Sequence, residues 1–237
     1  MDTILFDLDG TLLPLDMEEF TKAYFKELSI KLSSYIEPEK LSKQVWSSTD
    51  YMIKNLDDKK TNMEAFFEDF DERIEHDVKE LKPVFDEFYK LDFTKLKDVV
   101  YPNKIVKEIV NILKNKGYDM VIATNPLFPR DAIYHRIEWA GLDRNDFTLI
   151  TTYENMHYCK PNLEYYKEIL YKIKKDSKDI MMIGNDMQED MVASKLGIKT
   201  YLVEDYMIDR GNISYSPNHK GSLQDLKILM EDLPSIK

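Results

Sequence analysis

A single cysteine, Cys159, occurs among the 237 residues, so no disulfide can form within one chain. Proteins without disulfides suit a reducing compartment, and we expect a cytoplasmic location. No apolar run approaches the ~20 residues that a membrane-spanning helix requires. Asp2 and Asp7 stand where a secretory signal would carry basic residues and a long apolar run. We therefore expect no membrane partner.

Basic residues are also scarce relative to acidic ones. Lys and Arg number 33 and Asp and Glu number 44, which gives a formal charge of −11. Binding to nucleic acid or to an anionic membrane surface needs a basic footprint, so we expect neither as a partner. Hydrophobic residues make up 43% of the chain, enough for the core of one α/β domain with or without a smaller insert. A monomer is the expected state.

Glycine is absent from residues 16–98, where Pro38 and Pro83 are the only prolines. Apolar residues recur there every three or four positions, which is typical of helices that each carry one apolar stripe. The members of this pattern are Phe20, Tyr24, Leu28, Phe66, Phe67, Phe70, Ile74, Leu81, Val84, Phe85 and Phe88. We therefore predict an inserted all-α cap domain over residues 15–98.

Outside this insert, the apolar pattern alternates between short strands and helices. Strands are predicted over residues 4–6, 119–124, 147–152, 179–186 and 199–203, and helices over residues 103–116, 128–140, 161–174 and 187–196. Such alternation is typical of βαβ units. We predict an α/β fold with a Rossmann-like parallel sheet and helices on both of its faces. Its core domain would consist of residues 1–14 and 99–237.

Polar residues capable of chemistry follow the predicted strands. Asp7 and Asp9 follow the first strand, two positions apart and so on the same side of an extended backbone. Thr124 and Asn125 follow the second strand, where a hydroxyl and a backbone N–H can bind a phosphate oxygen. Lys160 lies between the third strand and the next helix. Read alone, each of these residues is compatible with a turn, a helix cap or a solvated surface.

A fourth group, Asn185, Asp186 and Asp190, lies at the end of the fourth strand. The carboxyl ends of parallel strands meet at one edge of a sheet, so all four groups are expected to converge. Mg²⁺ prefers oxygen ligands, and carboxylates near a buried strand need a compensating cation. The four groups together predict a site for Mg²⁺ and a phosphate group.

In this order the motifs resemble those of the haloacid dehalogenase superfamily, and the helical insert is similar to that family's type 1 cap. The resemblance rests on Asp7-Leu8-Asp9-Gly10-Thr11, then Thr124, then Lys160, and then the cluster from Gly184 to Asp190. It implies that Asp7 is a nucleophile that forms an aspartyl-phosphate, and that Asp9 acts first as an acid and then as a base. It further implies that Thr124 holds the phosphoryl group and that Lys160 neutralises charge, so the expected catalytic residues are Asp7, Asp9, Thr124 and Lys160. The expected phosphate-binding residues are Asp7, Gly10, Thr11, Thr124, Asn125 and Lys160.

The resemblance also implies an Mg²⁺ site built from Asp7, the main-chain carbonyl of Asp9 and an acid of the last motif. Many relatives carry Asp directly after the glycine of that motif, whereas this chain has Asn185 there and Asp186 one position later. Because a carboxylate is the stronger Mg²⁺ ligand, we predict Asp186 as the third ligand, with Asn185 and Asp190 as alternatives.

The expected function is that of a magnesium-dependent phosphatase acting on a small phosphorylated metabolite. Dehalogenating relatives lack an acid at the position of Asp9, because a halide leaving group needs no proton, so Asp9 favours phosphoryl chemistry. A phosphomutase similar to β-phosphoglucomutase could use the same core, and a non-catalytic phospho-ligand binding protein is a further alternative. Candidate anion contacts in the cap are Lys22, Lys26, Lys54 and Arg73.

Overall fold

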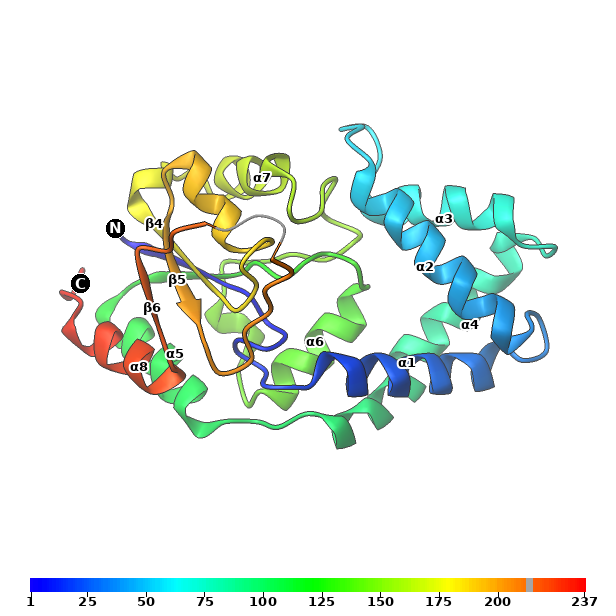
Figure 1. Cartoon of the computed structure of the whole chain (residues 1–237), viewed down its shortest axis with the longest axis horizontal. Coiled ribbons are helices and arrows are strands. Elements are labelled where there is room, and N and C mark those ends of the chain that lie inside the picture. The colour runs from blue at the N-terminus through cyan, green and yellow to red at the C-terminus, as the bar shows by residue number, and fades with distance from the viewer. Residues whose placement is uncertain (212–214) are drawn as a thin grey trace.

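The computed structural model describes residues 1–211 and 215–237 and contains a parallel sheet of six strands (Figure 1). The strands follow one another across the sheet in the order β3-β2-β1-β4-β5-β6. Their bounds are β1 Thr3–Phe6, β2 Asp119–Ile122, β3 Leu149–Ile150, β4 Ile180–Gly184, β5 Lys199–Val203 and β6 His219–Gly221. The predicted α/β class and the parallel, Rossmann-like sheet are confirmed.

Helices occupy most of the remaining chain. The α-helices are α1 Met17–Leu32, α2 Pro38–Lys54, α3 Asn62–Arg73, α4 Val78–Lys90, α5 Lys104–Lys116, α6 Arg130–Trp139, α7 Leu163–Ile173 and α8 Leu223–Asp232, and the 3₁₀ helices are η1 Asp92–Val99, η2 Arg144–Asp146, η3 Ser177–Asp179 and η4 Met191–Leu196. Within the described ranges, no helix combines the length and the apolar character needed to cross a membrane.

Alternate residues of β1 enter two different cores. Ile4 and Phe6 pack with buried residues of α5 and α8 on one face of the sheet. Leu5 packs with buried residues of α7 and η4 on the other face. This alternation is the two-residue period of a strand, and it requires helices on both faces.

The strand order reverses at β1, and this reversal positions the site. From β1 the chain continues to β2 and β3 on one side, and it then crosses to β4 on the other side of β1. In open α/β sheets, ligands bind outside the carboxyl ends of the strands at such a reversal. The loops after β1, β2 and β4 meet at this edge of the sheet.

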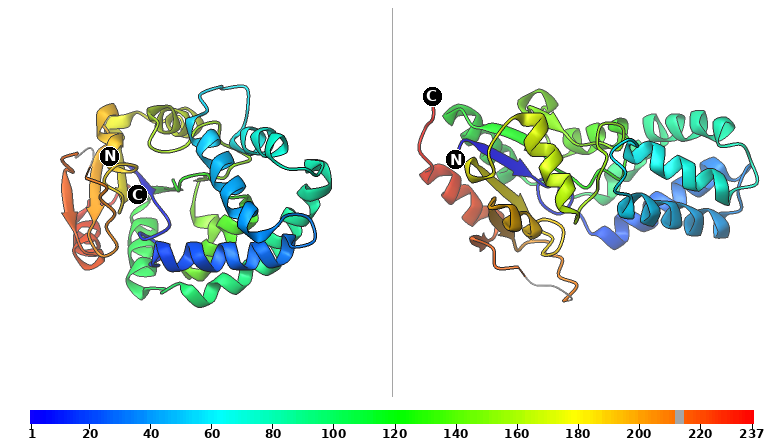
Figure 2. Two further views of the ribbon diagram at one scale, coloured as in Figure 1. Left: turned by 45° about the vertical axis from the view of Figure 1, so that its right-hand side comes forward. Right: turned by 90° about the horizontal axis from the view of Figure 1, so that it is seen from above.

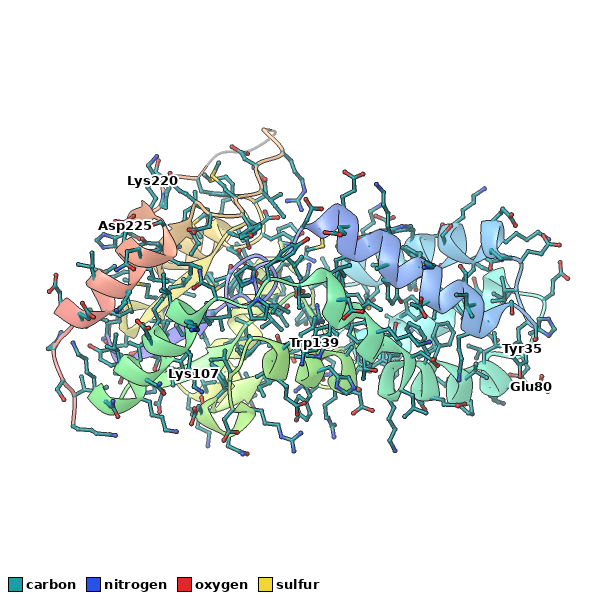
Figure 3. The ribbon with its side chains drawn as sticks, turned by 90° about the horizontal axis from the view of Figure 1, so that it is seen from below. Tyr35, Glu80, Lys107, Trp139, Lys220 and Asp225 are labelled. Atoms are coloured by element: carbon teal, nitrogen blue, oxygen red, sulfur yellow. The ribbon has the colours of Figure 1, made fainter. Side chains whose placement is uncertain are left out.

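Helices α1 to α4 lie beyond this edge, on the side of the molecule away from both chain termini (Figures 1 and 2). Figure 3 shows Tyr35 and Glu80 at the far end of this group, and Lys220 and Asp225 toward the opposite end of the molecule. The chain enters and leaves the group through two adjacent segments, which an antiparallel bridge between Leu15 and Val100 joins. That residues 15–98 form a separate cap domain stays a prediction.

The helical group and the sheet share one continuous hydrophobic cluster. Phe20 and Phe93 belong to the same buried cluster as Ile4 and Phe6. The Phe93 ring stacks on Trp139 of α6, with ring centroids 5.7 Å apart. The two parts of the chain are therefore packed against each other and not merely tethered.

Residues 187–196 do not form the α-helix predicted from the sequence but a turn followed by η4. Asp186 Oδ1 accepts the backbone N–H groups of Gln188 and Glu189, each at 2.9 Å. Asp190 Oδ2 accepts the backbone N–H of Asp186, also at 2.9 Å. Carboxylates that bond to nearby backbone donors compete with helix formation, so this segment turns back on itself.

Candidate active site

Asp7 begins the loop after β1, and its carboxylate is hydrogen-bonded to Lys160. The Lys160 Nζ atom lies 2.8 Å from Asp7 Oδ1 and 2.6 Å from Asp190 Oδ1. The lysine side chain is only 1% exposed. Burial disfavours its charge, but the attraction of Asp190 and Asp7 outweighs burial and raises the pKa of Lys160 well above its ordinary value. Lys160 is therefore a fixed positive charge beside Asp7.

Asp9 pairs with Arg136 of α6, a residue that the sequence analysis did not identify. Arg136 Nη1 donates to Asp9 Oδ2, and Arg136 Nε donates to the Ala132 carbonyl at 3.2 Å. The guanidinium group lies over the Phe128 ring, 4.6 Å from its centroid. Burial raises the pKa of Asp9, and the charge of Arg136 opposes that rise. No local pattern marks Arg136, because it is 127 positions away from Asp9 in the chain.

One oxygen of Asp9 stays unpaired. Asp9 Oδ1 is buried, and no donor among the described residues bonds to it. Asp9 lines the same cavity as Asp7. A carboxyl group that is hydrogen-bonded at one oxygen only can give or accept a proton at the other oxygen.

The turn after β4 is built around Asp190. Its Oδ1 bonds to Lys160, and its Oδ2 accepts the backbone N–H of Asp186 at 2.9 Å. A Cβ on Gly184 would overlap this carboxylate, so β4 has to end in glycine. Burial raises the pKa of Asp190, and Lys160 limits that rise.

Arg210 is a second cation that the sequence analysis missed, and it pairs with Asp186. Arg210 Nη1 lies 2.8 and 2.7 Å from the two carboxylate oxygens of Asp186, and Nη2 lies 3.3 Å from Glu189 Oε1. Arg210 belongs to the segment after β5, which a bridge between Asp186 and Ile208 joins to the β4 turn. Burial and the charge of Asp186 raise the pKa of Glu189 to about 7.

Asn185 connects the turn after β4 to two other loops. Its Oδ1 accepts the Thr11 hydroxyl at 3.0 Å, and its Nδ2 donates to the Tyr206 carbonyl at 2.6 Å. A Cβ on Gly10, which has a φ of +78°, would overlap the Asn185 amide. The Thr11 hydroxyl also lies 3.4 Å from Asp7 Oδ2. Asn185 therefore stabilises the loop that carries Asp7.

Thr124 and Asn125 follow β2 at the same edge. Thr124 is 3% exposed, and its carbonyl accepts the Tyr165 hydroxyl at 2.8 Å. Asn125 Oδ1 accepts the backbone N–H of Lys160 at 3.1 Å, and its Nδ2 donates to Glu189 Oε2 at 2.9 Å. Asn125 thus fixes the Lys160 loop against the turn after β4.

A cavity of about 310 Å³ lies between the strand ends and helices α1 to α4. The predicted site residues that line it are Asp7, Asp9, Thr124, Asn125, Asn185, Asp186 and Asp190. Gly10, Thr11 and Lys160 do not line it, although they contact residues that do. The structure therefore brings the four predicted groups together.

The candidate anion contacts of the helical segment lie elsewhere. None of Lys22, Lys26, Lys54 and Arg73 lines the cavity. Three of them form ion pairs within their own helices, namely Lys22 with Glu18, Lys54 with Asp50 and Arg73 with Asp69.

The donor chemistry of the site suits a hard cation. Lys160, Arg136 and Arg210 are outnumbered by five neighbouring carboxylates, which are Asp7, Asp9, Asp186, Glu189 and Asp190. Mg²⁺ prefers such oxygen ligands, and unbalanced buried carboxylates favour a bound cation. Within residues 1–211 and 215–237, however, no three His, Cys, Asp or Glu side chains are grouped as ligands of one ion. The residues therefore supply the oxygen ligands that Mg²⁺ prefers. Arg210 would compete with the ion for the Asp186 carboxylate.

The parallel sheet and its acidic edge define the class of the protein, which is a Rossmann-like α/β fold with its candidate site at the carboxyl ends of the strands. Residues 4–203 match the family model described as haloacid dehalogenase-like hydrolase, so the chain belongs to that family. No curated protein sequence matches the chain.

Solved structures share the fold at low sequence identity. The HAD phosphatase from Thermococcus onnurineus is 17% identical, with a TM-score of 0.60 and 100% of each chain covered. YfnB from Bacillus subtilis, a HAD-hydrolase bound to magnesium, is 19% identical, with a TM-score of 0.56 and 98% of each chain covered. The L-2-haloacid dehalogenase from Xanthobacter autotrophicus is 14% identical, with a TM-score of 0.60, and 98% of this chain and 99% of that chain are covered. Because these neighbours include a phosphatase and a dehalogenase, the fold by itself does not select the reaction.

Proposed function

We propose that the protein is a magnesium-dependent phosphatase that hydrolyses a small phosphate monoester through an aspartyl-phosphate on Asp7. The observation that carries this proposal is the state of Asp9. It lines the cavity with Asp7, its Oδ2 pairs with Arg136, and its Oδ1 is buried with no hydrogen-bond partner among the described residues. The alcohol of a phosphate ester needs a proton to leave, whereas a halide does not, so a carboxyl group in this place serves phosphoryl transfer.

The two carboxyl groups divide the reaction into two steps. In the first step an Asp7 oxygen attacks phosphorus, the bond between phosphorus and the alcohol oxygen breaks, and Asp9 gives its proton to that oxygen. In the second step Asp9 takes a proton from water, the water oxygen bonds to phosphorus, and the aspartyl bond breaks. Inorganic phosphate leaves, and both carboxyl groups return to their starting states.

The remaining groups stabilise charge and hold the phosphoryl group. Lys160 supplies a fixed positive charge beside Asp7, and Asn125 holds the Lys160 loop in place. Thr124 lines the cavity and would hold the phosphoryl oxygens through its hydroxyl. Mg²⁺ bound by Asp7, the Asp9 main chain and Asp186, with Asn185 and Asp190 as alternative ligands, would add positive charge at those oxygens.

The proposal is tested with the purified chain, Mg²⁺ and para-nitrophenyl phosphate. We expect steady release of inorganic phosphate, which Asp7→Asn abolishes, and no release of chloride from 2-chloropropionate. Chloride release without phosphate release would contradict the proposal and identify a dehalogenase. Isomerisation of a sugar phosphate without net phosphate release would identify a phosphomutase, and binding of a phosphate ester without turnover would identify a binding protein.

A further inference from the structure

The wall of the cavity opposite Asp7 is aromatic and uncharged. Helices α1 to α4 supply rings to it, among them Phe20, Phe25, Phe66, Phe67 and Phe85. No Asp, Glu, Lys, Arg or His of residues 15–98 lines the cavity. The charged residues that line it all come from the strand ends and from the segment after β5.

Three hydroxyl groups of this wall, those of Tyr24, Tyr89 and Thr49, take part in hydrogen bonds within the protein. The hydroxyl oxygens of Tyr24 and Tyr89 lie 2.8 Å apart and share a hydrogen bond. Burial raises the pKa of Tyr24 to about 12 and that of Tyr89 well above its usual value, so both rings are neutral. The Thr49 hydroxyl donates to the Val45 carbonyl at 2.8 Å. A ligand therefore meets apolar surface here, with little need for charged or strongly polar groups of its own.

We propose that the leaving group of the substrate is an uncharged, ring-bearing apolar group, which these aromatic side chains bind while the phosphate lies at Asp7. This inference rests on the proposed phosphatase function for the chemistry at Asp7. Ligand pockets of this kind are mostly apolar and have a few placed polar groups. A leaving group with a carboxylate would lose its hydration against this wall and find no cation there.

The proposal is tested by comparing three alkyl phosphates in the presence of Mg²⁺. 2-Phenylethyl phosphate and ethyl phosphate differ by a ring but leave as alcohols of similar acidity, and 2-phosphoglycolate adds a carboxylate. We expect kcat/KM for 2-phenylethyl phosphate to exceed that for ethyl phosphate by about 10- to 100-fold, the effect of fully burying a ring-sized apolar group. Equal values, or a preference for 2-phosphoglycolate, would overturn the inference and leave the phosphatase function intact.

Trp46 provides a variant that is not expected to disturb the fold. It lines the cavity, is 54% exposed, and its ring centroid lies 5.7 Å from that of Phe25. Trp46→Ala is expected to reduce the preference for the phenyl group, measured as the ratio of kcat/KM for 2-phenylethyl phosphate to kcat/KM for ethyl phosphate, several-fold. Tyr171→Ala is the matched control, because Tyr171 is an aromatic residue of α7 that is 84% exposed and does not line this cavity. If both variants reduced the preference for the phenyl group equally, the result would contradict the binding of the ring by this wall of the cavity.

Binding separates this inference from the proposed function if the chain hydrolyses none of the phosphates. Calorimetry in Mg²⁺ then measures the affinities of 2-phenylethylphosphonate and ethylphosphonate, and their ratio reports the contribution of the aromatic wall to binding. Binding of the phenyl compound at least about 10-fold more tightly supports the inference without the phosphatase function. Equal binding of the two phosphonates, or binding of neither, overturns it.

Discussion

Arg136 and Asp9 form an ion pair between helix α6 and the loop after β1, with the guanidinium group 1% exposed. The pair holds Asp9 Oδ2, whereas Asp9 Oδ1 is buried and has no hydrogen-bond partner among the described residues. Arg136 also opposes the rise in the pKa of Asp9 that burial causes. We therefore expect Arg136 to act as a positioning residue that sets the protonation of Asp9.

Replacing Arg136 should move the pH dependence of the reaction. Without the positive charge in Arg136→Gln, the protonated form of Asp9 is favoured and its pKa rises further. The acidic limb of the kcat profile, which reports ionised Asp9 as a base, should shift to higher pH by about 1 unit or more. Arg136→Lys keeps the charge and should restore most of the profile, and Arg144→Gln removes an arginine that lies over Tyr134 and serves as the control. A lower rate with an unshifted profile would contradict an effect of Arg136 on the protonation of Asp9.

Replacing Asp7 and replacing Asp9 with asparagine should affect different steps of the reaction. Asp7→Asn removes the nucleophile, so turnover should vanish and no phosphoenzyme should form. Asp9→Asn removes proton transfer, which is typically worth ~10²–10⁴-fold. An activated aryl phosphate needs little protonation of its leaving group, so Asp9→Asn should give a burst of phenol followed by slow turnover. Complete loss in both variants, with no burst and no trapped phosphoenzyme, would contradict the division of roles.

Arg210 should weaken the binding of Mg²⁺, because its guanidinium group bonds to both carboxylate oxygens of Asp186. Arg210→Gln should lower the Mg²⁺ concentration needed for half-maximal activity several-fold. Excess EDTA should abolish the activity of both proteins. Lys220→Gln, which removes an exposed cation paired with Glu204 after β5, is the matched control. A higher Mg²⁺ requirement in Arg210→Gln would show that Arg210 supports the metal site instead.

Gly184 should tolerate no side chain, for a steric reason. Gly184→Ala would place a Cβ on the Asp190 carboxylate and disturb the bond from Asp190 to Lys160. Crowding in a packed site costs about 1–3 kcal/mol of unfolding free energy, and here it should also remove most of the activity. Gly141→Ala is the control, because a Cβ there meets open space and only the left-handed φ of +76° opposes it. It should cost about 1 kcal/mol and leave kcat unchanged, as measured by urea unfolding and phosphate release.

Asp69 should make the stability of the helical segment depend on pH. Burial opposes the ionised form, but the hydrogen bonds from Arg73 outweigh burial and lower the pKa of Asp69 below its ordinary value. A lowered carboxyl pKa stabilises the folded state above the unfolded-state pKa, and this contribution is lost as the pH falls through the folded-state pKa. Asp69→Asn should therefore destabilise the protein most near neutral pH, with a difference that shrinks below about pH 4. Asp50→Asn, in an exposed pair with Lys54, should show a much smaller difference in urea unfolding at each pH.

The sequence by itself determined the class of fold and the place of the site. Apolar runs bounded by glycine fixed β1, α5 and β2 closely, because strand and helix periods are local properties of the chain. Gly117 ends α5 with a φ of 91°, as a residue without a Cβ can. The polar groups after the strands were found because parallel strands bring their carboxyl ends together whatever lies between them.

The apolar pattern of the sequence led to a wrong prediction where side-chain hydrogen bonds set the backbone conformation. The turn at 187–190 replaced a predicted helix because Asp186 and Asp190 bond to nearby backbone N–H groups. Strand β6 was not predicted. It has only three residues, and because two of them, His219 and Lys220, are exposed, the strand carries no apolar pattern.

Only the tertiary structure decided which charges pair. Arg136 and Arg210 lie 127 and 24 positions from the carboxylates that they contact, and no sequence spacing links such partners. The uncharged wall of the cavity was hidden for the same reason, since the aromatic pattern of residues 16–98 looks identical for rings that fill a core and rings that line a cavity. Periodicity fixes which face of a helix is apolar, but only packing in three dimensions decides what that face meets.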